Sequence, residues 1–337
     1  MQNINTLTSN RGGYRDKALD LLKYVTIFMV VTGHTFQYLG YGLDCLDLFP
    51  IDIFTMIQMP QFMFISGFVS FKSLQNAPYK YLLETRWKSL LRPMIFYSLV
   101  IYTEAIIWGG NLSVLGPIKA YINSYWFIWA VIYSLIFMYV SIRILKLNSA
   151  LTVLMAIATC LIPSKFIPIP HFSLFQAMLP FFLFGFYCKQ YDILDKIYRK
   201  FNYIAPFALF IFFCCLYFYN GRNSFYFFRE MAFIEMMKSF CFMLIAGTSG
   251  IILCYCLIKY SLTKLKNVDF AITAGQYTFA IYMMQGIVFN TLQHYNLNFR
   301  EYWLCWIVAI LIFGAINTLI KIVREAKLLS LLLLGKQ

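Results

Sequence analysis

The chain consists of long apolar segments separated by short polar stretches, and this pattern constrains its fold more than any other feature of the sequence. Ten segments are long enough, or nearly so, to cross the roughly 30 Å of hydrocarbon in a bilayer as an α-helix. They cover residues 19–39, 50–71, 89–109, 126–145, 149–163, 171–188, 203–219, 239–260, 270–290 and 302–323. Because an unpaired backbone amide is costly in lipid, each crossing segment has to be helical. The pattern predicts an all-α, polytopic integral membrane bundle of about ten transmembrane helices.

Composition and charge narrow the class of protein further. Of the 337 residues, 61% are apolar and only 12% are charged, whereas a soluble domain carries about 25% charged residues. The net charge of +14 is better explained by basic residues at the ends of membrane helices than by a nucleic-acid partner. All hydrophilic stretches are short, so we expect a single transmembrane domain over residues 1–337, with the first segment as an uncleaved anchor. The nine cysteines show no metal-binding spacing, and we expect no bound metal.

The basic residues also predict the topology. If the N-terminus is cytoplasmic, most of the 28 lysines and arginines fall in cytoplasmic stretches, which is the usual bias. We therefore expect cytoplasmic tails at residues 1–18 and 324–337. Two segments are ambiguous: the fifth is short and could be re-entrant, and the eighth could begin near Met231. In that case Glu235 and Lys238 would lie on one helix face and could pair.

The first apolar segment carries two ionisable residues, Lys23 and His34. Their spacing of eleven residues places them on one helix face, about 16 Å apart along the axis. Because charge is expensive in hydrocarbon, ionisable residues within membrane helices are candidates for function. One face of this helix thus carries a cation near the cytoplasmic surface and an imidazole deep toward the other surface.

Other polar residues fall at the predicted depth of His34. Glu104 and Gln285 lie about as far along the third and ninth segments, which run in the same direction. Tyr125, Trp126 and Trp129 open the fourth segment at a similar level. If the helices touch, Glu104 could orient His34 as a general base; alternatively, each is satisfied separately by backbone carbonyls or water.

Lys23 has a functional and a simpler interpretation. It could bind a phosphate that reaches up from the cytoplasm, together with Arg86, Lys88 and Arg92 at the start of the third segment. It could equally be neutralised by Asp20 or extend to the headgroups. The three residues of the third segment also follow the positive-inside bias, so the sequence leaves both interpretations open.

Six short motifs, in order, resemble those of the acyltransferase-3 family of membrane acyltransferases. They are RDKALDLLKYVTIFMVVTGH with Lys23 and His34, MPQFMFISGF with Ser66 and Gly67, RWKSLLRPMIFY, YWFIWA, LPFFLFGFY with Gly185, and GQYTFAIYMMQ with Gly275. Two positions depart from the family pattern. Lys23 stands where arginine is commoner, and Gln285 stands where the last motif often has histidine.

The resemblance implies an enzyme that moves an acyl group, acetyl or succinyl, from cytoplasmic acyl-coenzyme A to a sugar hydroxyl of a surface or exported polysaccharide or glycolipid. No bound cofactor is implied. Acyl-coenzyme A is a co-substrate, and the setting is the bacterial inner membrane, with glycan-synthesis machinery as a possible partner. In this interpretation His34 and Glu104 are catalytic, Ser66 and Gly67 are structural, and the acyl-coenzyme A phosphates bind Lys23, Arg86, Lys88 and Arg92.

The acceptor pocket would contain Tyr125, Trp126, Trp129 and Gln285, although aromatic residues at that depth are also typical of an interfacial belt. A two-step route through an acyl-histidine remains an alternative. Two other functions remain open: a transporter or flippase of a lipid-linked glycan, and an accessory membrane subunit. The chain shows no repeat of broken helices of the kind that many transporters have.

Overall fold

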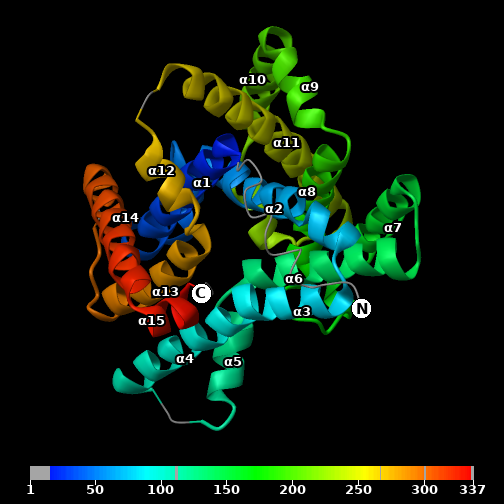
Figure 1. Ribbon diagram of the computed structural model, residues 1–337. Helices are drawn as coiled ribbons and strands as arrows, with labels where there is room; N and C mark the ends of the chain where they lie inside the picture. Colours follow the sequence, from blue (N-terminus) through cyan, green and yellow to red (C-terminus); the bar gives the residue numbers. More distant parts are fainter. Residues whose placement is uncertain (1–15, 111–112, 266, 300, 335–337) are drawn as a thin grey trace.

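The computed structural model describes residues 16–110, 113–265, 267–299 and 301–334, and all regular secondary structure within these ranges is helical (Figure 1). The longer helices are α1 (Lys17–Phe36), α2 (Ile51–Asn76), α4 (Arg92–Ile107), α6 (Trp126–Tyr139), α7 (Ser149–Leu161), α8 (Phe172–Gln190), α10 (Phe201–Phe218), α11 (Phe233–Lys264), α13 (Thr278–His294) and α14 (Tyr302–Glu325). The shorter α-helices are α3 (Tyr79–Arg86), α5 (Gly116–Asn123), α9 (Ile193–Arg199), α12 (Asp269–Gly275) and α15 (Lys327–Leu333).

Short π- and 3₁₀-helical elements connect or extend these helices. The π-helical ones are η2 (Gln37–Tyr41), η4 (Trp87–Leu91) and η5 (Val140–Ile144). The 3₁₀ elements are η3 (Gly42–Asp47), η6 (Ser164–Phe166), η7 (Gly221–Asn223) and η8 (Phe225–Phe227). Within the described residues, eight helical stretches are long and apolar enough to cross a membrane. The predicted fold class, a polytopic helical membrane protein, is confirmed.

The ten predicted segments are all largely helical, but several of their ends differ. The third helical stretch begins at Tyr79 instead of residue 89, because α3 and η4 continue directly into α4. The eighth begins at Phe233, as the alternative allowed, but Glu235 and Lys238 are exposed and make no ion pair with each other in the described part of the chain. The fifth, α7, is a short helix of 13 residues.

The prediction of one continuous helix over residues 270–290 is wrong. The chain turns at Gln276 and Tyr277, between α12 and α13. The last residue of α12, Gly275, packs against the backbone of α1, where an added Cβ would lie 1.9 Å from the carbonyl oxygen of Asp20. This contact fixes α12 against the start of α1, and the turn then lets α13 run past the other end of the same helix.

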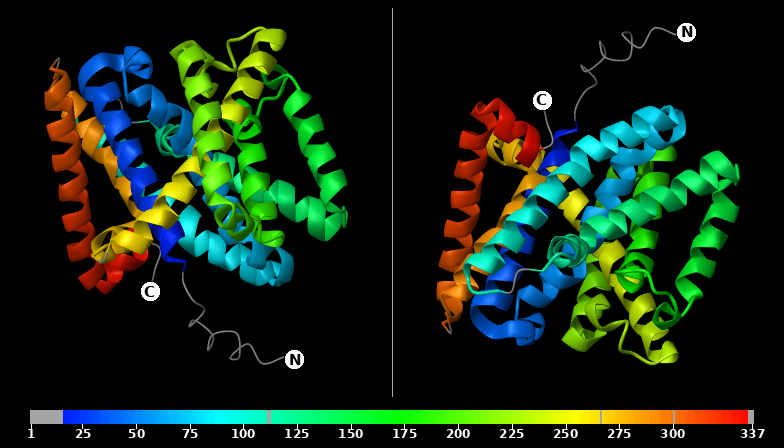
Figure 2. Two further views of the ribbon diagram at one scale, coloured as in Figure 1. Left: turned by 90° about the horizontal axis from the view of Figure 1, so that it is seen from above. Right: turned by 90° about the horizontal axis from the view of Figure 1, so that it is seen from below.

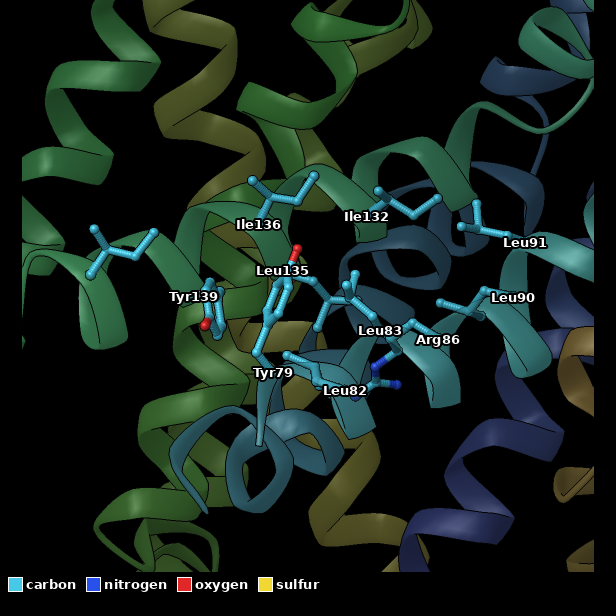
Figure 3. A pocket seen from close by; sticks show the side chains of 11 residues that line it. Tyr79, Leu82, Leu83, Arg86, Leu90, Leu91, Ile132, Leu135, Ile136 and Tyr139 are labelled. Atoms are coloured by element: carbon cyan, nitrogen blue, oxygen red, sulfur yellow. The ribbon is translucent and has the colours of Figure 1, made fainter. Parts of the chain in front are cut away.

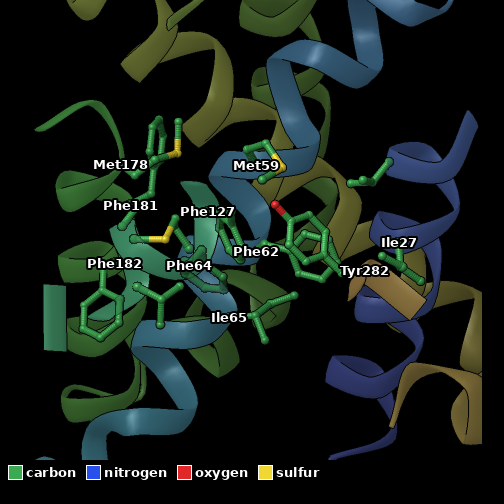
Figure 4. Close-up of a cluster of buried hydrophobic side chains, with 14 of the residues drawn as sticks. Ile27, Met59, Phe62, Phe64, Ile65, Phe127, Met178, Phe181, Phe182 and Tyr282 are labelled. Carbon is green, nitrogen blue, oxygen red and sulfur yellow. The ribbon is translucent and has the colours of Figure 1, made fainter. Parts of the chain in front are cut away.

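The centre of the bundle is the contact between α2 and α8. Gly67 and Gly185 make it reciprocal: a Cβ on Gly67 would lie 1.9 Å from the carbonyl oxygen of Phe182, and one on Gly185 would lie 1.8 Å from that of Phe64. Small residues allow membrane helices to approach this closely. Around the pair, α1, α6 and α13 add large apolar side chains to the same buried cluster (Figure 4).

The described ends of the chain lie at one end of the bundle. Both views of Figure 2 place the start of α1 beside the end of α14 and α15. Within the predicted C-terminal tail, α15 is a packed helix, and the backbone carbonyl of its Leu331 accepts a hydrogen bond of 2.8 Å from Arg92. Most of the predicted N-terminal tail, residues 1–15, and residues 335–337 lie outside the described ranges. The cytoplasmic location of both ends stays a prediction.

Candidate active site

A polar cavity of about 290 Å³ lies at the far end of α1 from Lys23. It is formed where the end of α1 and η2 meet α4, the junction of α5 and α6, and one face of α13. Its walls are His34, Tyr38, Ile101, Asn123, Ser124, Tyr125, Tyr282, Gln285, Gly286, Phe289, Asn290 and Gln293. Amide, hydroxyl and imidazole groups thus converge on one space from α1, η2, the junction of α5 and α6, and α13, while α4 contributes the apolar Ile101.

Helical geometry explains the contribution of α13. Relative to Tyr282, its lining residues Gln285, Gly286, Phe289, Asn290 and Gln293 recur at the spacings that keep side chains on one helix face. Residues between them, such as Met283 and Met284, are buried against other parts of the bundle. One polar face of an otherwise apolar helix is therefore turned toward His34.

His34 lies in the wall of this cavity, in contact with aromatic rings. Its imidazole is 5.4 Å from the ring of Tyr38 and 6.0 Å, edge to face, from the ring of Phe289, measured between centroids. The side chain of Gln285 lies beside it. The predicted proximity of His34 and Gln285 is thus present in the structure.

Tyr125 is held at the cavity by its position at the N-terminal end of α6. It precedes the first helical residue, has backbone angles of φ −134° and ψ 61° that are neither helical nor extended, and is only 2% exposed. Its hydroxyl donates a 3.2 Å hydrogen bond to the backbone carbonyl of Met283 on α13. This bond ties the start of α6 to α13 across the cavity.

Trp126 and Trp129, predicted to share the acceptor pocket with Tyr125, face elsewhere. Trp126 packs against Phe225 and Tyr226, with centroid distances of 5.8 and 6.0 Å. Trp129 packs against Tyr121 and Tyr133. Neither lines the cavity that contains His34.

Glu104 does not take the place beside His34 that the sequence suggested. Its Oε2 accepts a 2.9 Å hydrogen bond from Nδ2 of Asn290, and its Oε1 accepts one from the hydroxyl of Thr291. Asn290 lines the cavity, whereas Glu104 faces a separate apolar hollow outside it. The carboxylate is therefore linked to the cavity through Asn290, and the residue beside His34 is the uncharged Gln285.

The four cations predicted to bind one anion each have a different local environment. Lys23 forms a 3.1 Å ion pair with Asp20, whose side chain is 2% exposed. Lys88 is exposed and pairs with Glu84 at 2.6 Å, and Arg92 donates to Leu331 of α15. No single partner gathers them within the described residues.

Arg86, the remaining cation, borders an apolar groove of about 630 Å³ between the α3–η4 stretch and α6. Its Nη2 donates to the hydroxyls of Ser70 and Ser73 on α2, at 3.2 and 3.0 Å. Figure 3 shows the guanidinium pointing away from Ile132 and Ile136 on the opposite wall. The arginine thus contributes its aliphatic part to the groove and ties the end of α3 to the end of α2.

Sequence reasoning predicted only His34, Tyr125 and Gln285 among the residues that line the cavity, and the residues it missed include Tyr38, Tyr282, Gly286 and Asn290. Three of these four lie on α13 at helical spacings from Gln285, so extending the face that contains Gln285 along the ninth segment would have found them. Tyr38 lies on the π-helical η2. The first predicted segment, residues 19–39, already contained it, and its spacing of four residues from His34 would have placed it on the same helix face.

Comparison with known proteins identifies the class. The chain matches the family described as "Acyltransferase domain" over residues 16–322, and it belongs to this family of membrane acyltransferases. Among curated proteins it is similar to the nodulation protein NolL of Mesorhizobium japonicum, with 28% identity over 86% of this chain and 80% of the relative. It is also similar to NolL of Sinorhizobium fredii, with 25% identity over 95% and 92%. No solved structure matches the chain.

Proposed function

We propose that this membrane acyltransferase moves an acetyl group from cytoplasmic acyl-coenzyme A to a sugar hydroxyl of a cell-surface or exported polysaccharide or glycolipid. A succinyl group is the alternative. The observation that carries the proposal is the position of His34 in a polar cavity of about 290 Å³. This volume is at the lower end of the usual range for small-molecule sites, so we expect it to admit one sugar unit and the acyl group.

The residues of the cavity suit an acceptor with several hydroxyl groups. Asn123, Asn290 and Gln293 offer amide donors and acceptors, and Tyr38 and Phe289 offer aromatic faces. In this mechanism His34 takes the proton of one sugar hydroxyl as that oxygen attacks the thioester carbonyl, and returns it to the departing thiolate sulfur. The products are the acyl ester and free coenzyme A.

Lys23 supports the donor side of the proposal. It lies on α1 about 16 Å from His34 along the helix axis, and its side chain remains 20% exposed beside Asp20. We propose that the phosphates of the donor bind near Lys23 on the cytoplasmic side of the inner membrane, with Arg86, Lys88 and Arg92 as further candidates. The acceptor would approach from the opposite side, together with the machinery that makes the glycan.

The test is consumption of the thioester by purified protein in detergent. Acetyl-coenzyme A and then succinyl-coenzyme A are supplied with the surface-glycan fraction of the cell, and free thiol and label on the glycan are measured. His34→Ala should lower the rate about 10²–10⁴-fold, the usual contribution of a general base. His294→Ala is the control, because His294 stacks on Trp108 at 3.9 Å and does not line the cavity.

Two outcomes would contradict the proposal. The first is a His34→Ala protein that stays folded and releases thiol at the rate of the wild type. The second is a wild-type protein that releases no thiol with any acyl donor but binds a lipid-linked glycan, which would favour the transporter or flippase.

A further inference from the structure

Gln285 is buried in an unusual way. Its side chain is 1% exposed, and neither Oε1 nor Nε2 makes a hydrogen bond of normal geometry to another described residue, although the side chain lies beside His34 and in the cavity wall. Because both Oε1 and Nε2 lack such a bond, exchanging the oxygen and nitrogen positions of the amide would not change the observation. Burying polar atoms without partners is costly, and native proteins usually avoid it.

Among the buried glutamines of the described chain, Gln58 and Gln61 lack a partner only for Oε1, and Gln285 alone lacks one for both amide atoms. Nε2 of Gln176, which is 5% exposed, donates to the carbonyl oxygens of Thr159 and Ile162, both at 2.7 Å. Nε2 of Gln61 donates to the hydroxyl of Thr26 and to the carbonyl of Leu22. These amides hold helices together, whereas neither atom of the Gln285 amide has a hydrogen bond of normal geometry within the described residues, and the amide lies beside His34 at the cavity.

We propose that Gln285 is a catalytic residue whose Nε2 binds the carbonyl oxygen of the transferred acyl group. This inference rests on the proposed function. As the acceptor oxygen bonds to the carbonyl carbon, its proton moves to His34 and the electron pair of the C=O bond moves to the carbonyl oxygen. Gln285 donates a hydrogen bond to that oxyanion. When the C=O bond re-forms, the C–S bond breaks and the thiolate takes the proton from His34.

The location of Gln285 suits this role. A donor that stabilises an oxyanion has to be fixed before the reaction and shielded from water. Gln285 is buried in the middle of α13, and its neighbours on the same helix, Met283 and Met284, are packed in the core. His34 and Gln285 lie side by side in the cavity wall, so the imidazole can take the proton of the attacking hydroxyl while the amide binds the oxygen of the carbonyl group under attack.

The experiment combines activity and stability for Gln285→Leu. Removal of one oxyanion donor should lower kcat about 10²–10³-fold, with little change in KM for acyl-coenzyme A. At the same time, thermal stability should stay unchanged or rise, because leucine replaces two unpaired polar atoms with apolar ones. Gln176→Leu is the matched control and should do the reverse: it loses two hydrogen bonds, so the protein becomes less stable while kcat per folded molecule is retained.

Gln285→Glu and Gln285→His distinguish an oxyanion donor from a residue that only orients His34. A carboxylate keeps the acceptor that could orient the imidazole, but it repels an oxyanion, so Gln285→Glu should be at least as inactive as Gln285→Leu. Gln285→His keeps a ring N–H donor and should retain more activity than either. Modification of His34 by diethyl pyrocarbonate should proceed at the same rate in Gln285→Leu as in the wild type.

Three results would overturn the inference without affecting the proposed function. They are near-normal kcat in Gln285→Leu, a loss of stability that accounts for its lost activity, and higher activity in Gln285→Glu than in Gln285→Leu. Failure of the proposed function has a different signature, because the wild type would then release no thiol at all. In that case the proposed oxyanion role of Gln285 is also wrong, and the stability of Gln285→Leu reports only on the burial of its unpaired polar atoms.

Discussion

The two ends of α1 differ in how polar side chains are arranged around them. At the His34 end, polar groups from α1, η2, the junction of α5 and α6, and α13 converge on one cavity. At the Lys23 end, each of the predicted cations has a partner of its own. Lys23 pairs with Asp20, and Lys88 pairs with Glu84. Arg86 donates to two serines of α2. The imidazole and the aromatic rings at the His34 end have few rotatable bonds, so the helix face on which they lie decides where they point. Lysine and arginine side chains are long and flexible and can reach a nearby acceptor in several directions.

The strongest test of the His34 end is to fill its cavity from Gly286. Gly286→Ala should be tolerated, because an added Cβ would meet the hydroxyl of Tyr125 at an ordinary 3.5 Å and alanine favours the helix. Gly286→Leu should project into the cavity and lower kcat/KM for the acceptor at least ~100-fold, since small misplacements of bound groups have effects of this size. Steady-state kinetics with the glycan acceptor measure the difference.

Both variants should remain folded, as judged by size-exclusion elution and thermal unfolding. A Gly286→Leu protein with normal acceptor kinetics would show that acyl transfer takes place elsewhere. The polar cavity at the His34 end of α1 would then not be the active site.

The fold was largely predictable from the sequence because hydrophobicity alone determines which segments enter a membrane. All ten predicted segments contain a helix, and the eight long ones in the described chain are confirmed as candidate spans. The break between α12 and α13 was not predictable in this way. It depends on the contact of Gly275 with the backbone of Asp20, a long-range fact that local hydrophobicity does not contain.

The site was predictable only in part, for a related reason. Counting residues along helices gave the depth of His34, Gln285 and Glu104, and two of these line one cavity. Counting does not give rotation about the helix axis, so Glu104 was assigned to His34 although its partners are Asn290 and Thr291. Nor could it show that Trp126 and Trp129 turn away from Tyr125.

A second prediction concerns the Lys23 end and should have a smaller effect. If Lys23 binds the donor phosphates, Lys23→Gln should raise KM for acyl-coenzyme A about tenfold, the equivalent of one charge-assisted hydrogen bond, and leave kcat unchanged. Lys88→Gln is the control. Its ion pair with Glu84 is exposed, and such pairs contribute little, so KM should change less than about twofold.

The double variant Asp20→Asn/Lys23→Gln separates the two interpretations of Lys23. Lys23→Gln alone leaves a carboxylate that is 2% exposed without its lysine, which should lower thermal stability. Removing both charges should restore stability but not the affinity for acyl-coenzyme A. If affinity returns together with stability, Lys23 only neutralises Asp20, and the Lys23 end of α1 has no direct part in donor binding.

The smallest expected effect is that of Glu104→Gln. It tests whether a residue outside the cavity at the His34 end affects catalysis through a residue that lines it. Glutamine can still accept a hydrogen bond from Asn290, but an uncharged acceptor binds less strongly than a carboxylate. We expect kcat to fall about fivefold, roughly the difference between a charged and a neutral hydrogen bond, because Asn290 is held less firmly in the cavity wall.

A double-mutant cycle with Asn290→Ala tests this route. If Glu104 acts through Asn290, Glu104→Gln should have no further effect once Asn290 is replaced. A large loss of kcat in Glu104→Gln that persists in the Asn290→Ala background would instead indicate a direct catalytic role for Glu104. The active site would then extend beyond the residues that line the cavity.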